Sequence, residues 1–167
     1  MRAGAKKYNT SYKKKVDVFR DTFLPRRSPK EIIQCRGCGA FYHRRRWTLI
    51  VPTEFSPPAL RRAWFCPACQ KIKAHSVSGE VHLHGVAERD RGEILRLLRN
   101  EEAKAREKNP LERIMLLAAV GGGWRVETTT EKLAQRLGRS LRKARGGKVN
   151  YTWSHNNKFV RVVWDQG

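Results

Sequence analysis

The stretch CRGCGAFYHRRRW, residues 35–47, sets a pair of cysteines shortly before three consecutive arginines. A second CxxC pair begins at Cys66, after 27 intervening residues. Two such pairs bring four thiolates together, which is a common way to close a tetrahedral zinc site. The spacing therefore predicts a zinc ribbon that binds structural Zn2+ through Cys35, Cys38, Cys66 and Cys69.

Other cysteine chemistries fit this pattern less well. A thioredoxin-like redox pair needs a single CxxC in a β-α-β setting, which the sequence does not offer. A catalytic zinc keeps one coordination position open, whereas four cysteines close the shell. Disulfides are disfavoured because the N-terminus lacks the apolar segment of a secretory signal, which points to the reducing cytoplasm. An iron–sulfur cluster also takes four cysteines, so it stays open until the metal is measured.

Charge is the second strong feature of the chain. There are 36 Lys and Arg against 15 Asp and Glu, which gives a net charge of +21. A field of this strength favours nucleic acid or an anionic membrane as partner. No apolar run reaches the roughly 18–20 residues of a membrane span, so we expect no membrane partner. The net charge is +8 for residues 1–30, +5 for 31–85, +1 for 86–109 and +7 for 110–167.

The first three of these segments are predicted to be an arm, a metal module and a connector. Residues 1–30 have almost no periodic apolar pattern and are predicted to be a disordered basic arm, or alternatively a solvated tail that aids solubility. Residues 31–85 hold the cysteines among short extended runs, of which EVHLH is the last, and are predicted to be the zinc ribbon. Residues 86–109 carry a short apolar stripe on a charged helix that Pro110 ends, which predicts a linker helix.

The fourth segment, residues 110–167, is predicted to be a small RNA-binding domain. The apolar run RIMLLAAV suits a buried strand, and WRVETT continues across a glycine turn as a second strand. A helix capped by one of the threonines at 128–130 follows, with Leu133, Leu137 and Leu141 at four-residue spacing. A glycine pair ends this helix, and KVNYTW and KFVRVVW are two further strands. The fold class is therefore α+β, with a β-β-α-β-β C-terminal domain.

Aromatic and valine side chains alternate along the last two predicted strands. A sheet like that of the RNA-recognition motif would expose such aromatics to stack on bases. In a domain with one helix, burial of these side chains beneath the helix leucines is the expected arrangement. The basic surface of the helix would then contact the nucleic-acid backbone rather than read bases.

The predicted RNA contacts come from the arm, the arginine cluster, the following loop and the basic helix. Lysines interleaved with tyrosines are typical of arms that lie along phosphate. For the arginine cluster the alternative is a solvated face. The full set is Lys6, Lys7, Lys13, Lys14, Lys15, Arg26, Arg27, Arg44, Arg45, Arg46, Arg61, Arg62, Arg136, Arg139, Arg142, Lys143 and His155.

The remaining residues give no sign of catalysis. His82 and His84 share one face of a strand and have the spacing to bind metal, but without a third ligand a solvent-facing strand side fits better. No serine–histidine–acid set and no carboxylate pair stands out. We therefore expect neither enzyme activity nor a small-molecule substrate.

The order of basic arm, cysteine knuckles, GEVHLHG, charged helix and TTEKLAQRLGRSLRKARGGKVNYTWSHNNKFVRVVW resembles an uncharacterised bacterial zinc-ribbon family. More distantly it is similar to the nonsense-mediated-decay-three-like proteins, the large-ribosomal-subunit export adaptors of archaea and eukaryotes. This sequence has two CxxC pairs where the adaptors have more, and we expect it to lack their later domains and export signals. The resemblance implies binding to ribosomal RNA on a subunit surface, and does not imply export.

Two function hypotheses follow from these features. The first is a non-enzymatic zinc protein of the cytoplasm that binds ribosomal RNA and associates with a ribosomal subunit, as an assembly, hibernation or quality-control factor. The alternative is a zinc-ribbon DNA-binding transcriptional regulator, which would need a helix that offers Arg, Asn or Gln to the major groove. A zinc-dependent hydrolase or nuclease is disfavoured by the closed cysteine shell.

Overall fold

The structure is a computed structural model, and it describes residues 23, 31–55, 64–154 and 159–167. The predicted disordered arm lies outside these residues except for Phe23. The predicted RNA contacts that also lie outside them are Lys6, Lys7, Lys13, Lys14, Lys15, Arg26, Arg27, Arg61, Arg62 and His155.

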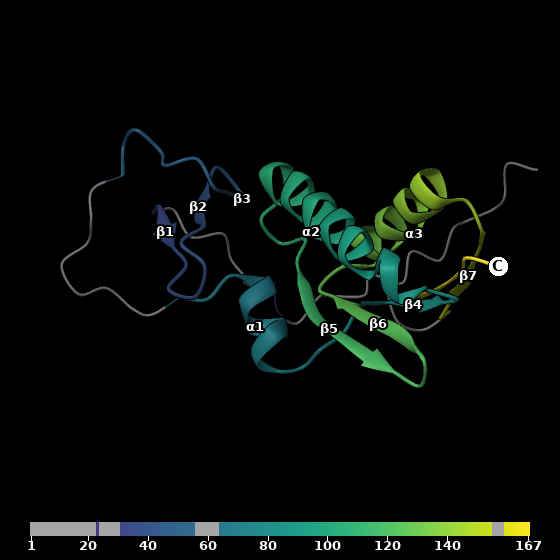
Figure 1. The fold of residues 1–167 in the computed structure, drawn as a ribbon. Helices are drawn as coiled ribbons and strands as arrows, with labels where there is room; N and C mark the ends of the chain where they lie inside the picture. Colours follow the sequence, from purple (N-terminus) through teal and green to yellow (C-terminus); the bar gives the residue numbers. More distant parts are fainter. Residues whose placement is uncertain (1–22, 24–30, 56–63, 155–158) are drawn as a thin grey trace, which may run out of the picture.

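The cysteine module combines a small sheet with one short helix (Figure 1). Strands β1 (Ile33–Gln34), β2 (Phe41–His43) and β3 (Arg46–Thr48) form an antiparallel sheet in that order. Helix α1 (Pro67–Lys73) begins at the second cysteine pair, where the sequence pattern does not predict a helix. Pro67 at its first position has a φ angle that is already suited to a helix start.

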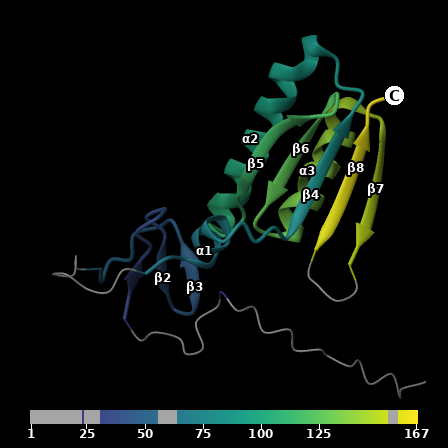
Figure 2. The ribbon, with the colours of Figure 1, turned by 90° about the horizontal axis from the view of Figure 1, so that it is seen from below.

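A five-stranded sheet with two helices forms the larger part of the described chain (Figure 1). Its elements are β4 (Gly79–His84), a 3-10 turn (Glu88–Asp90), α2 (Arg91–Lys108), β5 (Ile114–Val120), β6 (Gly123–Thr128), α3 (Glu131–Arg145), β7 (Lys148–Trp153) and β8 (Val160–Asp165). The strand order is β5-β6-β4-β8-β7, with β4 antiparallel to β6 and parallel to β8. Helices α2 and α3 lie on one face of the sheet, and no described helix covers the other (Figure 2).

The position of β4 differs from the sequence prediction, which places this strand in the zinc ribbon of residues 31–85. In the structure β4 is the central strand of the larger sheet and pairs with both β6 and β8. Val81 and Leu83 alternate with more exposed residues and are fully buried. The prediction was wrong because a parallel partner far along the chain leaves no mark in the local sequence.

Helix α2 also differs from the prediction, which makes residues 86–109 a spacer between two modules. Ile94 and Leu98 are buried in the core of the larger sheet. The buried Glu102 carboxylate accepts a hydrogen bond from the Ile114 backbone N–H at 2.8 Å. The short apolar stripe is therefore sufficient to pack α2 on the sheet. No helix in the described part of the chain is long and apolar enough to cross a membrane.

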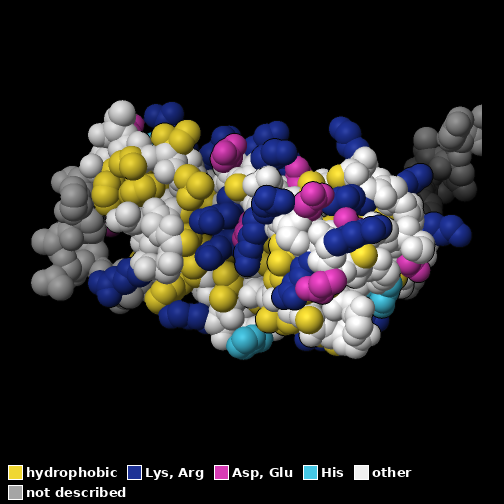
Figure 3. All heavy atoms as spheres, in the orientation of Figure 1, with side chains coloured by type: hydrophobic (Ala, Val, Ile, Leu, Met, Phe, Trp, Pro, Cys, Tyr) yellow, Lys and Arg dark blue, Asp and Glu magenta, His cyan; other side chains and the backbone are white. Residues whose placement is uncertain are grey.

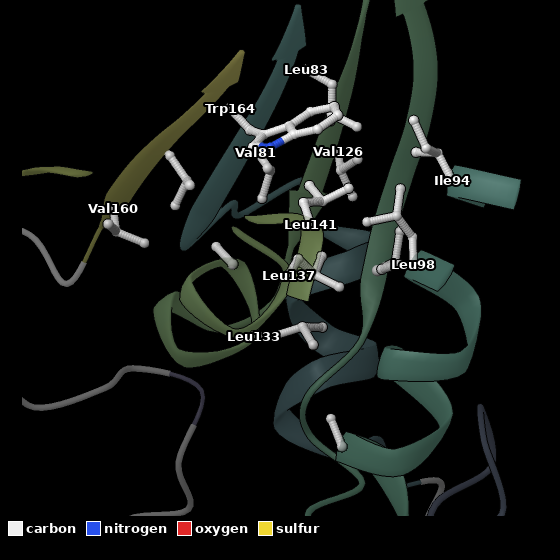
Figure 4. Close-up of a cluster of buried hydrophobic side chains, with 14 residues drawn as sticks. Val81, Leu83, Ile94, Leu98, Val126, Leu133, Leu137, Leu141, Val160 and Trp164 are labelled. Atoms are coloured by element: carbon white, nitrogen blue, oxygen red, sulfur yellow. The ribbon is translucent and has the colours of Figure 1, made fainter. Parts of the chain in front are cut away.

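The core lies between the sheet and its two helices (Figure 4). Leu133, Leu137 and Leu141 are fully buried, as their spacing predicts. Thr130 caps α3 by accepting a hydrogen bond from the Leu133 N–H at 3.2 Å, and Gly146 ends the helix with a φ of 72°. Burial of a leucine side chain contributes about 1.5–3 kcal/mol, so this apolar layer holds the helices on the sheet.

The two edge strands are more exposed than the sequence suggests. Strand β5, predicted to be buried, is an edge strand with an exposed outer end at Val120. At the other edge, Tyr151 and Trp153 of the edge strand β7 are 40% and 48% exposed. Trp164 of the neighbouring strand β8 is buried. The aromatic side chains thus divide between core and surface, because α3 contacts the inner strand β8 more fully than the edge strand β7.

Candidate metal centre and basic surfaces

The four predicted metal ligands come together at one point. Each cysteine offers its Sγ atom, and the four atoms lie within 4.8 Å of one another. The Sγ atoms of Cys38 and Cys66 are 3.6 Å apart, too far for a disulfide, and all four thiols are free. Tetrahedral Zn–S bonds of about 2.3 Å place sulfur ligands about 3.8 Å apart. The cluster therefore suits one metal ion.

Two turns of different kinds carry these ligands. Cys35 and Cys38 lie on a loop after β1, where the Gly39 N–H donates to the Cys35 carbonyl at 2.9 Å. Cys66 caps α1, and its Sγ accepts a hydrogen bond from the Cys69 N–H at 3.4 Å. The Cys66 N–H donates to the Cys35 Sγ at 3.1 Å. Backbone donors directed at sulfur favour the thiolate, which is the form that binds metal.

Three of the four cysteines are buried, and Cys38 is partly exposed. Cys35 and Cys66 are 1% and 0% exposed, and Cys69 is 6% exposed. No other metal-ligating side chain of the described residues, His82 and His84 included, joins the four cysteines. Four cysteine ligands would fill a tetrahedral shell and leave no position for water or substrate, so the arrangement favours a structural metal.

The thiols strongly perturb one another. A hydrogen bond with Cys66 is the main reason that the pKa of Cys38 is lowered to about 4. The same contact raises the pKa of the Cys66 thiol, and burial raises the pKa of Cys69 to about 11. Four thiols this close cannot all lose their protons unless a positive charge compensates them, and a bound metal cation would supply that charge.

Arg113 connects the cysteine cluster to the larger sheet. Its Nη1 donates a hydrogen bond to the Cys69 Sγ at 3.3 Å. Its backbone N–H donates to the Thr129 Oγ1 at 2.9 Å, which fixes the residue beside the start of β5. Leu111, from the same segment, packs against the cysteines. The sequence does not indicate this contact, because an isolated arginine 44 residues beyond Cys69 is not part of any recognisable motif.

The arginine cluster forms the tip of the hairpin between β2 and β3. Arg44 and Arg45 have φ angles of 49° and 66°, in the left-handed region that asparagine and glycine favour. All three arginines, Arg46 included, are exposed. Arg44 lies 3.7 Å from Glu54, but an ion pair between such exposed side chains contributes little. The hairpin tip therefore presents cations on a strained backbone.

Helix α3 presents a second basic surface, and Figure 3 shows lysine and arginine side chains spread over the face that α2 and α3 form. Of the predicted contacts, Arg139, Arg142 and Lys143 are exposed and have no ion-pair partner among the described residues. Arg136 differs, because its Nε donates to the Glu101 carboxylate of α2 at 3.1 Å. The hairpin and α3 lie toward opposite ends of the described chain, so they are separate surfaces (Figures 1 and 2).

The open face of the larger sheet is electrically balanced instead. Arg161 and His82 both contact the Glu80 carboxylate, at 3.2 Å and 3.1 Å. Burial raises the pKa of Glu80, but the hydrogen bonds from His82 and Arg161 outweigh it and the net shift is downward. On the neighbouring strand Arg125 pairs with Glu127 at 3.2 Å. Arg161 and Arg125 on this face are therefore already paired with acids.

Comparison with known proteins identifies no relative: no protein-family model, no curated protein and no solved structure matches the chain. The functional interpretation therefore depends on the chemistry of the cysteine cluster and of the two basic surfaces.

Proposed function

We propose that this chain is a non-enzymatic zinc protein of the cytoplasm that binds ribosomal RNA and associates with a ribosomal subunit, in assembly, hibernation or quality control. The observation that carries the proposal is a closed four-cysteine cluster in a chain with a net charge of +21. The cluster supplies a rigid scaffold without an open catalytic position. The charge favours a polyanion whose phosphates many Lys and Arg side chains neutralise together.

Zinc is the ion that best fits the cluster. Tetrahedral sulfur sites select zinc or iron–sulfur centres among the common biological metals. Four Sγ atoms gathered within 4.8 Å suit a single ion better than a four-iron cluster, in which each thiolate binds a different iron. Metal analysis of the purified protein is expected to find one zinc per chain. Iron with acid-labile sulfide would contradict this assignment.

The hairpin tip supports a binding role for its arginines. A left-handed backbone costs a residue with a side chain roughly 1–2 kcal/mol relative to its ordinary conformation. Asparagine and glycine adopt that conformation more readily, yet positions 44 and 45 are both arginine. The backbone conformation disfavours arginine at these two exposed positions. A binding role for the Arg44 and Arg45 side chains would explain why arginine is present there.

Binding to purified ribosomal subunits tests the proposed function. We expect the full-length protein to sediment with a subunit at low salt and to dissociate as the salt concentration rises, because phosphate contacts release counterions. Absence of binding at low salt, or binding that salt does not change, would contradict the proposal. Duplex DNA that competes as well as structured RNA would favour the DNA-binding regulator.

The double substitution Arg44→Asn with Arg45→Gly separates binding from folding at the hairpin tip. We expect the free energy of unfolding of the cysteine module to rise, because both new residues suit the turn. Affinity for a ribosomal RNA fragment, measured by fluorescence anisotropy, should fall because two cations are lost. If affinity is unchanged, the arginine cluster is a solvated face.

A further inference from the structure

A groove of about 320 Å³ lies between α2 and α3. Four cations of α3 line it together with two acids, and the six residues are Lys132, Arg136, Arg139, Lys143, Glu101 and Glu112. The cations follow the order i, i+4, i+7 and i+11, so they lie along one side of the helix. With a rise of about 1.5 Å per residue this row extends over roughly 16 Å.

The acids of the groove are already engaged within the protein. Glu101 accepts hydrogen bonds from Lys104 at 2.9 Å and from Arg136 at 3.1 Å. Burial raises the pKa of Glu101, but its hydrogen bonds from Lys104, Arg136 and Ser140 outweigh this and the net shift is downward. The charged Glu101 carboxylate thus holds the Arg136 guanidinium in place, so Arg136 is the least mobile cation of the row.

The cations at the rim are differently placed. Lys132 lies 3.9 Å from Glu112, at the far limit of an ion pair, and its side chain is 78% exposed. Arg139 and Lys143 are exposed and have no ion-pair partner among the described residues. The groove therefore combines an anchored guanidinium with two cations that are unpaired among the described residues, Arg139 and Lys143, and with Lys132, whose contact with Glu112 is long.

We propose that the α2–α3 groove binds the phosphate backbone of double-stranded RNA along this row of cations. The inference rests on the proposed RNA-binding function and specifies the surface and the form of RNA. Successive phosphates of one strand rise roughly 3 Å along a duplex, so a row of about 16 Å matches several of them. Backbone contacts of this kind position a duplex without reading its bases.

The surroundings of the groove favour a nucleic-acid duplex over single-stranded RNA or a protein partner. Binding of single-stranded RNA normally uses aromatic stacking platforms, and the groove lining contains no aromatic residue. The exposed aromatics Tyr151 and Trp153 belong to the edge strand β7 instead. A protein partner would favour an apolar interface core, but no large apolar side chain of α2 or α3 is among the exposed ones in the described chain.

The test compares Arg139→Gln with Lys143→Gln in the groove against Lys148→Gln with Arg161→Gln on the open sheet face. Both double variants of the full chain lose two positive charges from exposed positions. The probes are a fluorescent RNA duplex of mixed sequence and a single strand of the same length. We expect the groove variant to bind the duplex about tenfold more weakly and the salt dependence of log K to become shallower by roughly 1 to 2.

The control variant is expected to change duplex affinity by less than about twofold, since it leaves the row of cations intact. Arg139→Lys with Lys143→Arg, which keeps both charges, should retain most of the affinity. Equal losses in groove and control variants, no loss in the groove variant, tighter binding of the single strand, or displacement of the duplex by polyglutamate at equal charge would each overturn the inference. If the unaltered protein binds no RNA, the proposed function itself fails.

Discussion

The cysteine module and the larger sheet reach a defined structure by different means. The buried residues around the cysteines are Cys35, Ala40, Cys66, Ala68 and Cys69, so three of the five are candidate metal ligands. The hydrophobic core of the larger sheet contains 14 buried apolar residues. Small modules with little apolar surface to bury need a metal or another cross-link. We therefore expect stability to come from metal binding in one region and from side-chain packing in the other.

The strands reflect the same difference. The small sheet has strands of two and three residues, whereas those of the larger sheet have six or seven. Short strands supply few hydrogen bonds and little buried area, and an isolated small sheet is at best marginally stable in water. A change that removes the metal should thus affect the two regions very differently.

The largest expected effect is that of metal removal. Cys35→Ser, or treatment with a strong chelator, should unfold the cysteine module while the larger sheet keeps its structure, because structural zinc contributes roughly 10–16 kcal/mol in comparable small modules. Hydrogen exchange measured by mass spectrometry checks this for the two regions separately. Ser76→Ala, a substitution outside the cysteine cluster, is the control and should leave the exchange of both regions unchanged. If the cysteine module stays protected from exchange without metal, its stability does not depend on the metal.

The converse change is Leu137→Ala in the core of the larger sheet. We expect the free energy of unfolding of this region to fall by about 2–5 kcal/mol, since the substitution leaves a cavity beneath α3. The metal content should stay the same, because Leu137 is not part of the cysteine cluster. Leu116→Ala, the same change at an exposed position of β5, is the control and should cost less than about 1.5 kcal/mol. Equal costs would show that the packed layer is not the source of stability.

A smaller effect is expected where the two regions meet. Arg113→Gln removes the guanidinium hydrogen bond to the Cys69 Sγ, which we expect to contribute about 1–2 kcal/mol because it joins two groups that are charged when the metal is bound. Transfer of zinc to a chromogenic chelator should become several-fold faster, with little change in the stability of the larger sheet. Arg36→Gln, an exposed arginine beside the ligands, is the control. Equal transfer rates in the two variants would remove Arg113 from the metal site.

Much of the local structure could be predicted from the sequence. The ligand set follows from the spacing of four cysteines, and α3 follows from three leucines, a threonine cap and a glycine stop. The four C-terminal strands are found where apolar runs predict them. These features depend on neighbours a few residues apart, which is the range over which periodicity and capping act.

The sequence alone therefore determined the candidate metal ligands, the element types of the C-terminal half and the excess of positive charge. Only the tertiary structure decided that β4 is the centre of the larger sheet, that α2 packs on that sheet and that Arg113 reaches Cys69. It also decided that Arg136 is anchored by Glu101 while Arg139 stays exposed. Each of these features depends on contacts between segments far apart in the chain. The pattern of residues within one segment does not specify which distant segment it will contact.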